Sequence, residues 1–230
     1  MARDYTSTCH ATGHLTARGL SPDGFSIFLY VAELSAGGAL EWDERHGDEA
    51  VYVIEGELDV DGTPGPAGGA VVVESGVGAR AAATMPTTIA HFGPVDPGAP
   101  RGATVHVIGP RGQFESPPGR PFFRFFVDST CPTCDAFLLY SQRDHGWAVT
   151  PHSHSADELV YVLDGTVMTG RRAHHAGDCL AYAAGQRYAL AAATDGFVTL
   201  NYRARPSELE FRDLDGSILE TARNVGGIEV

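Results

Sequence analysis

Two histidines and a glutamate lie close together in the second half of the sequence, at positions 152, 154 and 158. Successive side chains of a β-strand point to opposite faces, so residues of equal parity share a face when the segment is extended. His152, His154 and Glu158 would then project into the same interior. Two neutral imidazoles and one carboxylate are ligands that suit a divalent ion such as Fe, Mn, Co, Ni or Zn.

The same stretch, HSHSADE, also allows a solvent-facing turn, in which Ser153, Ser155 and Asp157 would be well hydrated. If the segment is buried instead, an unpartnered carboxylate is costly to ionise and the imidazoles need hydrogen-bond partners. A bound metal would meet all of these requirements at once. We therefore predict one divalent metal ion here.

The segments that must position these residues recur along the chain at an offset of 109 residues. EAVYVIEG at 49–56 matches ELVYVLDG at 158–165 in this register. Three glycine pairs fall on the same offset: Gly37 and Gly146, Gly68 and Gly177, Gly76 and Gly185. One register kept over so long a stretch indicates two copies of one structural unit.

Each copy is rich in β-branched and aromatic runs bounded by glycine, which predicts short strands that form a barrel or sandwich. The runs are 25–34, 50–60 and 68–74 in the first copy and 136–142, 158–170 and 178–185 in the second. The aromatic run 121–126 predicts a further strand. A helix is expected only at 217–227, where a serine cap precedes an amphipathic stretch and a glycine stop.

The spacing in the second copy resembles the first motif of the cupin superfamily, G-x5-H-x-H-x3-E-x6-G, with every anchor present from Gly146 to Gly165. The second cupin motif, G-x5-P-x-G-x2-H, is matched in part. Its glycines are Gly177 and Gly185, whereas alanine replaces its proline and Tyr188 replaces its histidine.

This resemblance implies an all-β protein of two tandem cupin barrels, of the double-stranded β-helix or jelly-roll type. The second barrel would hold the metal through His152, His154 and Glu158. We expect an N-terminal domain at 1–112, a linker rich in proline and glycine at 113–121 and a C-terminal domain at 122–230.

Tyr188 stands where the resemblance places a fourth ligand, and three roles are open for it. It can ligate as a phenolate, although an ordinary pKa of about 10 makes that costly. It can instead hydrogen-bond a bound ligand or substrate, or simply line the barrel. His145, next to Gly146, is a second candidate catalytic residue, as an acid or base near the barrel mouth.

The first copy lacks the two histidines. The offset places Asp43 and Arg45 opposite them, while Glu49 keeps the carboxylate. Arginine is always cationic and cannot bind a metal ion. We therefore predict a degenerate metal site in this copy, with Arg45 paired to Glu49 inside the barrel, and we place His46 at the surface.

The charge balance excludes several classes of function. The chain of 230 residues has a formal net charge of −13, and all 16 of its basic residues are arginine. Such an acidic surface disfavours nucleic acid and anionic membranes as partners. The lack of lysine excludes Schiff-base chemistry. We see no signal peptide and no apolar run of about 20 residues, so we expect a cytoplasmic protein.

Only Cys131 and Cys134 have the spacing of a cysteine motif. A zinc ribbon needs a second such pair. The redox motif needs a helix after the pair, whereas the following DAFLLY favours a strand. We therefore favour a structural role for this pair over a redox or metal role. His91 and His106 fit no motif and are predicted to be exposed, or buried with satisfied hydrogen bonds.

These observations favour a metal-dependent enzyme that acts on a small-molecule substrate. Iron and dioxygenation come first, because three protein ligands leave positions for O2 and substrate. An isomerase, epimerase, lyase or cyclase would use the metal as a Lewis acid instead. A non-catalytic ligand-binding protein is a third alternative, and a homodimer is left open.

Overall fold

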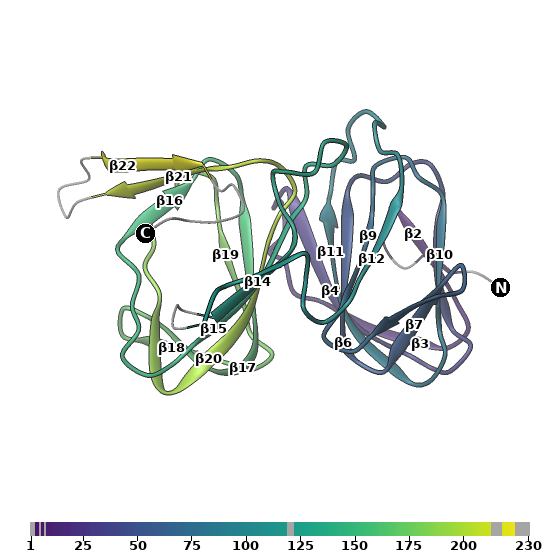
Figure 1. Ribbon diagram of the computed structural model, residues 1–230, viewed down its shortest axis with the longest axis horizontal. Helices are drawn as coiled ribbons and strands as arrows, with labels where there is room; N and C mark the ends of the chain where they lie inside the picture. Colours follow the sequence, from purple (N-terminus) through teal and green to yellow (C-terminus); the bar gives the residue numbers. More distant parts are fainter. Residues whose placement is uncertain (1–2, 5, 7, 119–121, 213–217, 224–230) are drawn as a thin grey trace. The chain divides into compact units, whose positions relative to one another are not determined.

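The computed structural model describes residues 3–4, 6, 8–118, 122–212 and 218–223 of the chain (Figure 1). Within these residues, the long regular elements are all β-strands, as the glycine-bounded runs predict. No helix in this part of the chain is long and apolar enough to cross a membrane.

The chain forms two compact units. Unit 1 comprises residues 1–113 and 131–135, and unit 2 comprises residues 114–130 and 136–230. The stretch 113–121, predicted as a linker, contains strand β13, which pairs with β14. Residues 119–121 lie outside the described residues. The predicted domain limits therefore differ from these units at 113–121 and at 131–135.

Unit 1 consists of two six-stranded antiparallel sheets. Their strand orders are β1-β2-β5-β10-β7-β8 and β12-β9-β6-β11-β4-β3. The bounds are β1 Arg3–Asp4, β2 Cys9–Thr12, β3 Leu15–Gly19, β4 Ile27–Leu34, β5 Ala39–Trp42, β6 Glu49–Glu55, β7 Glu57–Val60, β8 Thr63–Pro66, β9 Ala70–Val73, β10 Ala79–Ala83, β11 Thr87–Pro94 and β12 Val105–Ile108.

The core of unit 1 takes side chains from both sheets. Leu40 and Leu58 of the first sheet cluster with Val51, Val71 and Ile89 of the second, and all are fully buried. Each such side chain contributes about 1.5–3 kcal/mol on burial. The alternation of strand residues is what directs these side chains inward.

Unit 2 has one seven-stranded and one three-stranded antiparallel sheet. The larger sheet has the order β13-β14-β15-β20-β17-β18, with β19 also paired to β17, and the smaller is β16-β21-β22. The bounds are β13 Phe114–Glu115, β14 Phe122–Val127, β15 Phe137–Arg143, β16 His152–His154, β17 Glu158–Thr169, β18 Arg172–His175, β19 Cys179–Tyr182, β20 Ala191–Arg203, β21 Glu208–Arg212 and β22 Ile218–Arg223.

The strands of the two units recur at the offset found in the sequence. For example, β8 and β9 of unit 1 match β18 and β19 of unit 2 at 109 residues. The repeated glycines have a conformational reason. Gly56 and Gly165 adopt φ of +86° and +71°, and a Cβ on Gly165 would lie 2.3 Å from the Gly196 carbonyl oxygen. Glycine is the residue that meets both conditions.

The helix predicted at 217–227 is wrong over its described part. Residues 218–223 form β22, which pairs antiparallel with β21. The other residues of the predicted helix lie outside the described residues. Short helices are marginal without tertiary support, so backbone pairing with an adjacent strand prevails over local propensity.

Candidate metal centre

The two predicted histidine ligands lie on β16, a short strand that pairs with β21. His152 and His154 are 6% and 7% exposed, and their ring centroids are 5.3 Å apart. Glu158, the first residue of β17, is 1% exposed. Ser153 lies between the histidines and hydrogen-bonds Glu210 of β21. The segment is therefore buried, unlike the solvent-facing turn that its sequence also allowed.

The three predicted ligands are not equally close to one another. The Nε2 atom of His154 lies 3.6 Å from Oε2 of Glu158. Among the described residues, however, the three side chains whose potential ligand atoms all lie within 4.8 Å of one another are Glu74, Cys131 and Cys134 of unit 1, and not these three. His152 would therefore have to move closer to share an ion, and the triad as a metal site stays a prediction.

Tyr188 points into this cluster. Its hydroxyl donates a hydrogen bond to Oε2 of Glu158, and its ring lies 4.4 Å from that of His152 and stacks on Tyr182 at 3.7 Å. The backbones of His152 and Tyr188 also exchange two hydrogen bonds. Burial and the nearby Glu158 raise the pKa of Tyr188 well above its ordinary value. Without a metal the side chain is thus a neutral phenol, and the three roles predicted for it stay predictions.

Arg203 was missed by sequence reasoning, yet it is the closest cation to Glu158. Its Nη1 donates to Oε1 of Glu158 at 2.6 Å, and both side chains are almost fully buried. Asn201 donates to the same oxygen at 3.3 Å. The guanidinium also lies 3.7 Å from the centroid of the Phe137 ring, which stabilises the cation there.

The sequence held a signal for these two residues. In the run FVTLNYR at 197–203, Thr199, Asn201 and Arg203 are polar at every second position of an otherwise apolar strand. Alternation alone shows that they share a face of β20. The pairing of β20 with β17 brings that face beside Glu158, and this pairing comes from the fold.

The protonation states suit a metal centre. Burial lowers the pKa of His154 to about 3 and also lowers the pKa of His152, so both imidazoles are neutral at pH 7. Burial acts to raise the pKa of Glu158, but His154, Arg203 and the Tyr188 hydroxyl together hold it below its ordinary value. Because His154 is uncharged at neutral pH, Arg203 is the cation that acts there. Metal ligands must be deprotonated in this way.

The hydrogen bonds of the imidazoles also fit a cation. Nδ1 of His152 lies 2.9 Å from the Thr150 carbonyl oxygen, so it carries the proton and leaves Nε2 with its lone pair. Nδ1 of His154 is buried without a hydrogen-bond partner among the described residues. If Nδ1 holds the proton, the Nε2 lone pair faces the Glu158 carboxylate. If Nε2 holds it, Nδ1 lacks a donor. A cation between Nε2 and Oε2 would remove the repulsion between the Nε2 lone pair and the carboxylate, with the proton on Nδ1.

The described contacts do not place His145 beside His152, His154 or Glu158. Its side chain is exposed, and its Nδ1 lies 3.3 Å from the carbonyl oxygen of Ala193. Its acid or base role therefore stays a prediction.

The corresponding carboxylate of unit 1 has different partners from those predicted. Arg45 is exposed and pairs with Asp43 at 2.9 Å, so the predicted pair of Arg45 with Glu49 is wrong. Glu49 is fully buried and accepts hydrogen bonds from the ring nitrogens of Trp42 and His91, each at 2.7 Å, and from the Thr8 hydroxyl. The loop before β6 turns Arg45 outward, where its charge stays hydrated.

Three other histidines of unit 1 are now placed. His46 was predicted at the surface but is buried, because its ring nitrogens lie 2.6 Å and 2.8 Å from the carbonyl oxygens of Gly47 and Val77. His91 is buried against Glu49, and His106 is half-buried and lies 2.7 Å from Glu74. His106 is paired, as predicted, whereas the prediction holds for His91 at Nε2 but not at its buried Nδ1, for which the described residues supply no hydrogen bond.

Comparisons with known proteins relate this architecture to solved structures. No protein-family model and no curated protein matches the chain. A cupin 2 conserved barrel domain protein from Leptotrichia buccalis aligns over 84% of this chain and 89% of its own length, with a TM-score of 0.56 and 14% identity. This chain has a cupin fold. The predicted fold class is therefore confirmed.

Two other solved structures align with similar scores. Protein Ylba from E. coli aligns with a TM-score of 0.60 and 14% identity, over 86% of this chain and 83% of its own. A single-residue mutant of Bacillus subtilis oxalate decarboxylase aligns with a TM-score of 0.61 and 14% identity, over 89% of this chain and 75% of its own. Cupin folds thus include enzymes, and at these identities the likeness establishes the fold alone.

Proposed function

We propose that unit 2 is a metal-dependent enzyme that acts on a small organic molecule bearing a carboxylate, with Fe(II)-dependent dioxygenation as its reaction. The observation that carries this proposal is a buried cluster of two neutral imidazoles and one ionised carboxylate, with a buried arginine beside it. This donor set suits a divalent ion with open coordination positions.

His152, His154 and Glu158 are the residues that would hold the metal. Oε2 of Glu158 is the oxygen nearest to His154, whereas Oε1 is already bonded to Arg203. Oε2 is therefore the oxygen that would face a cation, and it would share that cation with its hydrogen bond from the Tyr188 hydroxyl. When bound, a metal there would supply Lewis acidity and, if it is iron, a centre for O2 activation.

Arg203 gives the reason for expecting an anionic substrate. Its charge already balances that of Glu158 at 2.6 Å, so a divalent cation would leave this buried site with about two uncompensated positive charges. Buried charge without compensation is costly. A substrate carboxylate would lower that cost, and the Arg203 guanidinium matches its two-oxygen geometry.

Tyr188 would hold a proton at the edge of the site. Its raised pKa keeps the hydroxyl protonated at neutral pH, and its hydrogen bond to Glu158 fixes its orientation. Apolar side chains of the same barrel, including Val160, Val162 and Leu180, form a buried cluster with it. These walls exclude water and so would protect reactive species.

Metal analysis of the full chain tests this proposal. The protein is purified without oxygen and without thiol reductant, and its metal content is measured beside His152→Ala and the matched control His14→Ala, which changes an exposed histidine. We expect about one metal ion per chain in the wild type and in the control, and a loss of it in His152→Ala. Equal metal content in all three proteins would contradict the proposal.

Oxygen uptake then separates the reaction classes. The metal-loaded protein is incubated with keto-, hydroxy- and dicarboxylic acids, and both O2 and the acid are followed. Dioxygenation requires that the concentrations of O2 and of the acid fall together. Turnover of an acid that continues without O2 would instead support an isomerase, epimerase, lyase or cyclase.

A non-catalytic binding role is the second candidate, and one observation favours it. Both oxygens of Glu158 already have donors, from Tyr188, Arg203 and Asn201, so its hydrogen bonds are complete without a metal. Glu49 of unit 1 is satisfied in the same manner, and we regard unit 1 as a structural copy without a metal. If the wild type binds no metal, unit 2 belongs to this class.

A further inference from the structure

A carboxylate and two cysteines of unit 1 meet at a loop that the proposed function does not use. Cys131 and Cys134 are joined by a disulfide. The potential ligand atoms of Glu74, Cys131 and Cys134 all lie within 4.8 Å of one another, a spacing found at no other group of three His, Cys, Asp or Glu side chains among the described residues. The loop leads into strand β15 and not into a helix, so it lacks the context of the redox motif.

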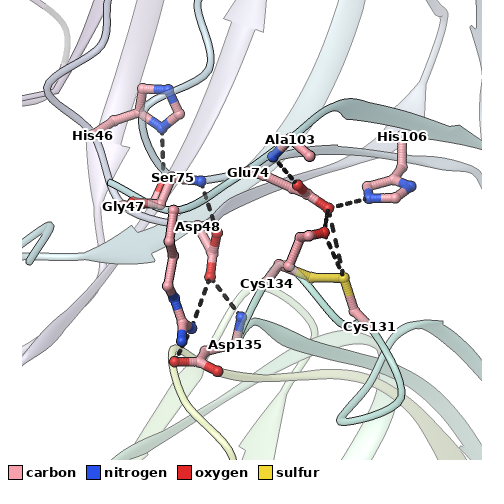
Figure 2. Close-up of polar contacts among 12 residues, drawn as sticks. His46, Gly47, Asp48, Glu74, Ser75, Ala103, His106, Cys131, Cys134 and Asp135 are labelled. Carbon is pink, nitrogen blue, oxygen red and sulfur yellow. Dashed lines mark hydrogen bonds and ion pairs between the residues drawn. A yellow bond between two sulfur atoms is a disulfide. The ribbon is translucent and has the colours of Figure 1, made fainter. Parts of the chain in front are cut away.

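Glu74 is fixed so that one of its oxygens is fully occupied by the backbone. The amide of Ala103 donates to Oε2 at 2.5 Å (Figure 2). The amide of Thr104 donates to the same oxygen at 3.1 Å. Gly102 permits this close approach, because a Cβ there would lie 2.5 Å from Cβ of Glu74. The carboxylate therefore cannot rotate freely, and its other oxygen is held in one direction.

That second oxygen, Oε1, faces the cysteines and a histidine. Figure 2 shows the Glu74 carboxylate beside the His106 ring and the disulfide. The distances from Oε1 are 2.7 Å to Nε2 of His106, 2.7 Å to the Thr133 hydroxyl and 3.5 Å to Sγ of Cys131. Burial acts to raise the pKa of Glu74, but the two amides, His106 and the Thr133 hydroxyl hold it below its ordinary value. Glu74 is a buried carboxylate at neutral pH.

We propose that, once the disulfide is reduced, Cys131, Cys134 and Glu74 bind one thiophilic divalent cation, Zn²⁺ being the best match, with His106 as the fourth ligand. Two thiolates beside a fixed carboxylate place three negative charges together, which is unfavourable unless a cation is present. In a tetrahedral zinc site, ligand atoms lie about 3.3–3.8 Å apart, given Zn–S of about 2.3 Å and Zn–O of about 2.0–2.2 Å. Small shifts bring Glu74, Cys131 and Cys134 to that spacing, because their ligand atoms already lie within 4.8 Å of one another. His106, which lies 2.7 Å from Oε1, would have to turn toward the ion.

The chemistry is a two-electron reduction followed by metal binding. A dithiol reductant gives two electrons and two protons to the Cys131–Cys134 disulfide, which becomes two thiols while the reductant becomes a disulfide. The cation then displaces one proton from each thiol into solvent, and two metal–sulfur bonds form. The oxidised loop has no thiolate to offer and should not bind the ion.

Cobalt(II) is the probe for this site, because thiolate ligation to cobalt gives charge-transfer bands in the near ultraviolet. The full chain is reduced under nitrogen, the reductant is removed, and one equivalent of Co²⁺ is added, followed by Zn²⁺. We expect thiolate bands in the reduced wild type, their bleaching by Zn²⁺, and no such bands in the oxidised protein. Cys134→Ser should lose the bands, and His106→Ala should weaken cobalt binding by about tenfold or more.

Two controls keep this result separate from the metal centre of unit 2. His154→Ala removes a predicted ligand of that centre, and Cys179→Ser removes a cysteine of unit 2. Both should retain the thiolate bands in full. Thermal unfolding of each variant shows whether it is folded. The proposal is overturned if the folded, reduced wild type gives no thiolate bands, or if the bands persist in Cys134→Ser.

Discussion

Replacing Arg203 with methionine tests whether that guanidinium compensates the charge of Glu158. The two side chains are 3% and 2% exposed, and the bond from Nη1 to Oε1 is 2.6 Å long. Removing one partner of a buried ion pair costs about 3–5 kcal/mol, because the other charge is left uncompensated. Methionine keeps much of the apolar contact, so we expect Arg203→Met to lower the unfolding free energy of unit 2 by about that amount.

A double variant isolates the charge effect. Glu158→Gln combined with Arg203→Met removes both charges and should recover at least about 2 kcal/mol of the loss. The chain has two tryptophans, Trp42 in unit 1 and Trp147 in unit 2. Urea unfolding followed by ¹⁹F NMR of fluorotryptophan-labelled protein therefore reports on each unit separately. A loss below about 1 kcal/mol in the single variant, or additive losses in the double variant, would refute this reasoning.

The remaining predictions concern the same buried networks. Acidification from pH 6.5 toward 3 should destabilise metal-free unit 2. His154 alone contributes up to about 1.4 kcal/mol per pH unit, because the unfolded chain takes up a proton that folded His154, with its pKa lowered to about 3 by burial, does not. Urea midpoints across this range measure the slope, and a flat profile would contradict it. Tyr188→Phe should cost unit 2 about 1–3 kcal/mol, because buried Glu158 loses a donor, and an unchanged urea midpoint would argue against that bond. His91→Leu should destabilise unit 1 by a similar amount, because buried Glu49 loses one of its three donors, whereas exposed Arg45→Ala should change the stability by less than about 0.5 kcal/mol. A larger loss of stability in Arg45→Ala than in His91→Leu, measured by the same unfolding assay, would instead support the pair first predicted between Arg45 and Glu49.

The alternation of strand side chains between two faces explains how much of the fold could be predicted from the sequence. Strand residues alternate between faces, so runs such as 158–170 are recognisable without a structure. The paired glycines mark turns that recur at the same offset, since residues such as Gly165 must adopt positive φ. The segment 218–223 was misassigned because its strand pairing depends on β21 and not on its own residues.

The site was predictable only where its residues are close in sequence. His152 and His154 share a face of one strand, so alternation alone places them together. Arg203 is 45 residues from Glu158, and their contact depends on the pairing of β17 with β20. The pair predicted between Arg45 and Glu49 was wrong for a different reason. An aligned position in a repeat does not decide which way a loop side chain points.

Anomalous diffraction from crystals of the protein reconstituted with a divalent metal tests the central claim most directly. The account predicts one strong peak in unit 2, about 2.0–2.2 Å from a nitrogen of His152, a nitrogen of His154 and an oxygen of Glu158. A map without a peak there, in which Glu158 remains bonded through both oxygens to Tyr188 and Arg203, would contradict it.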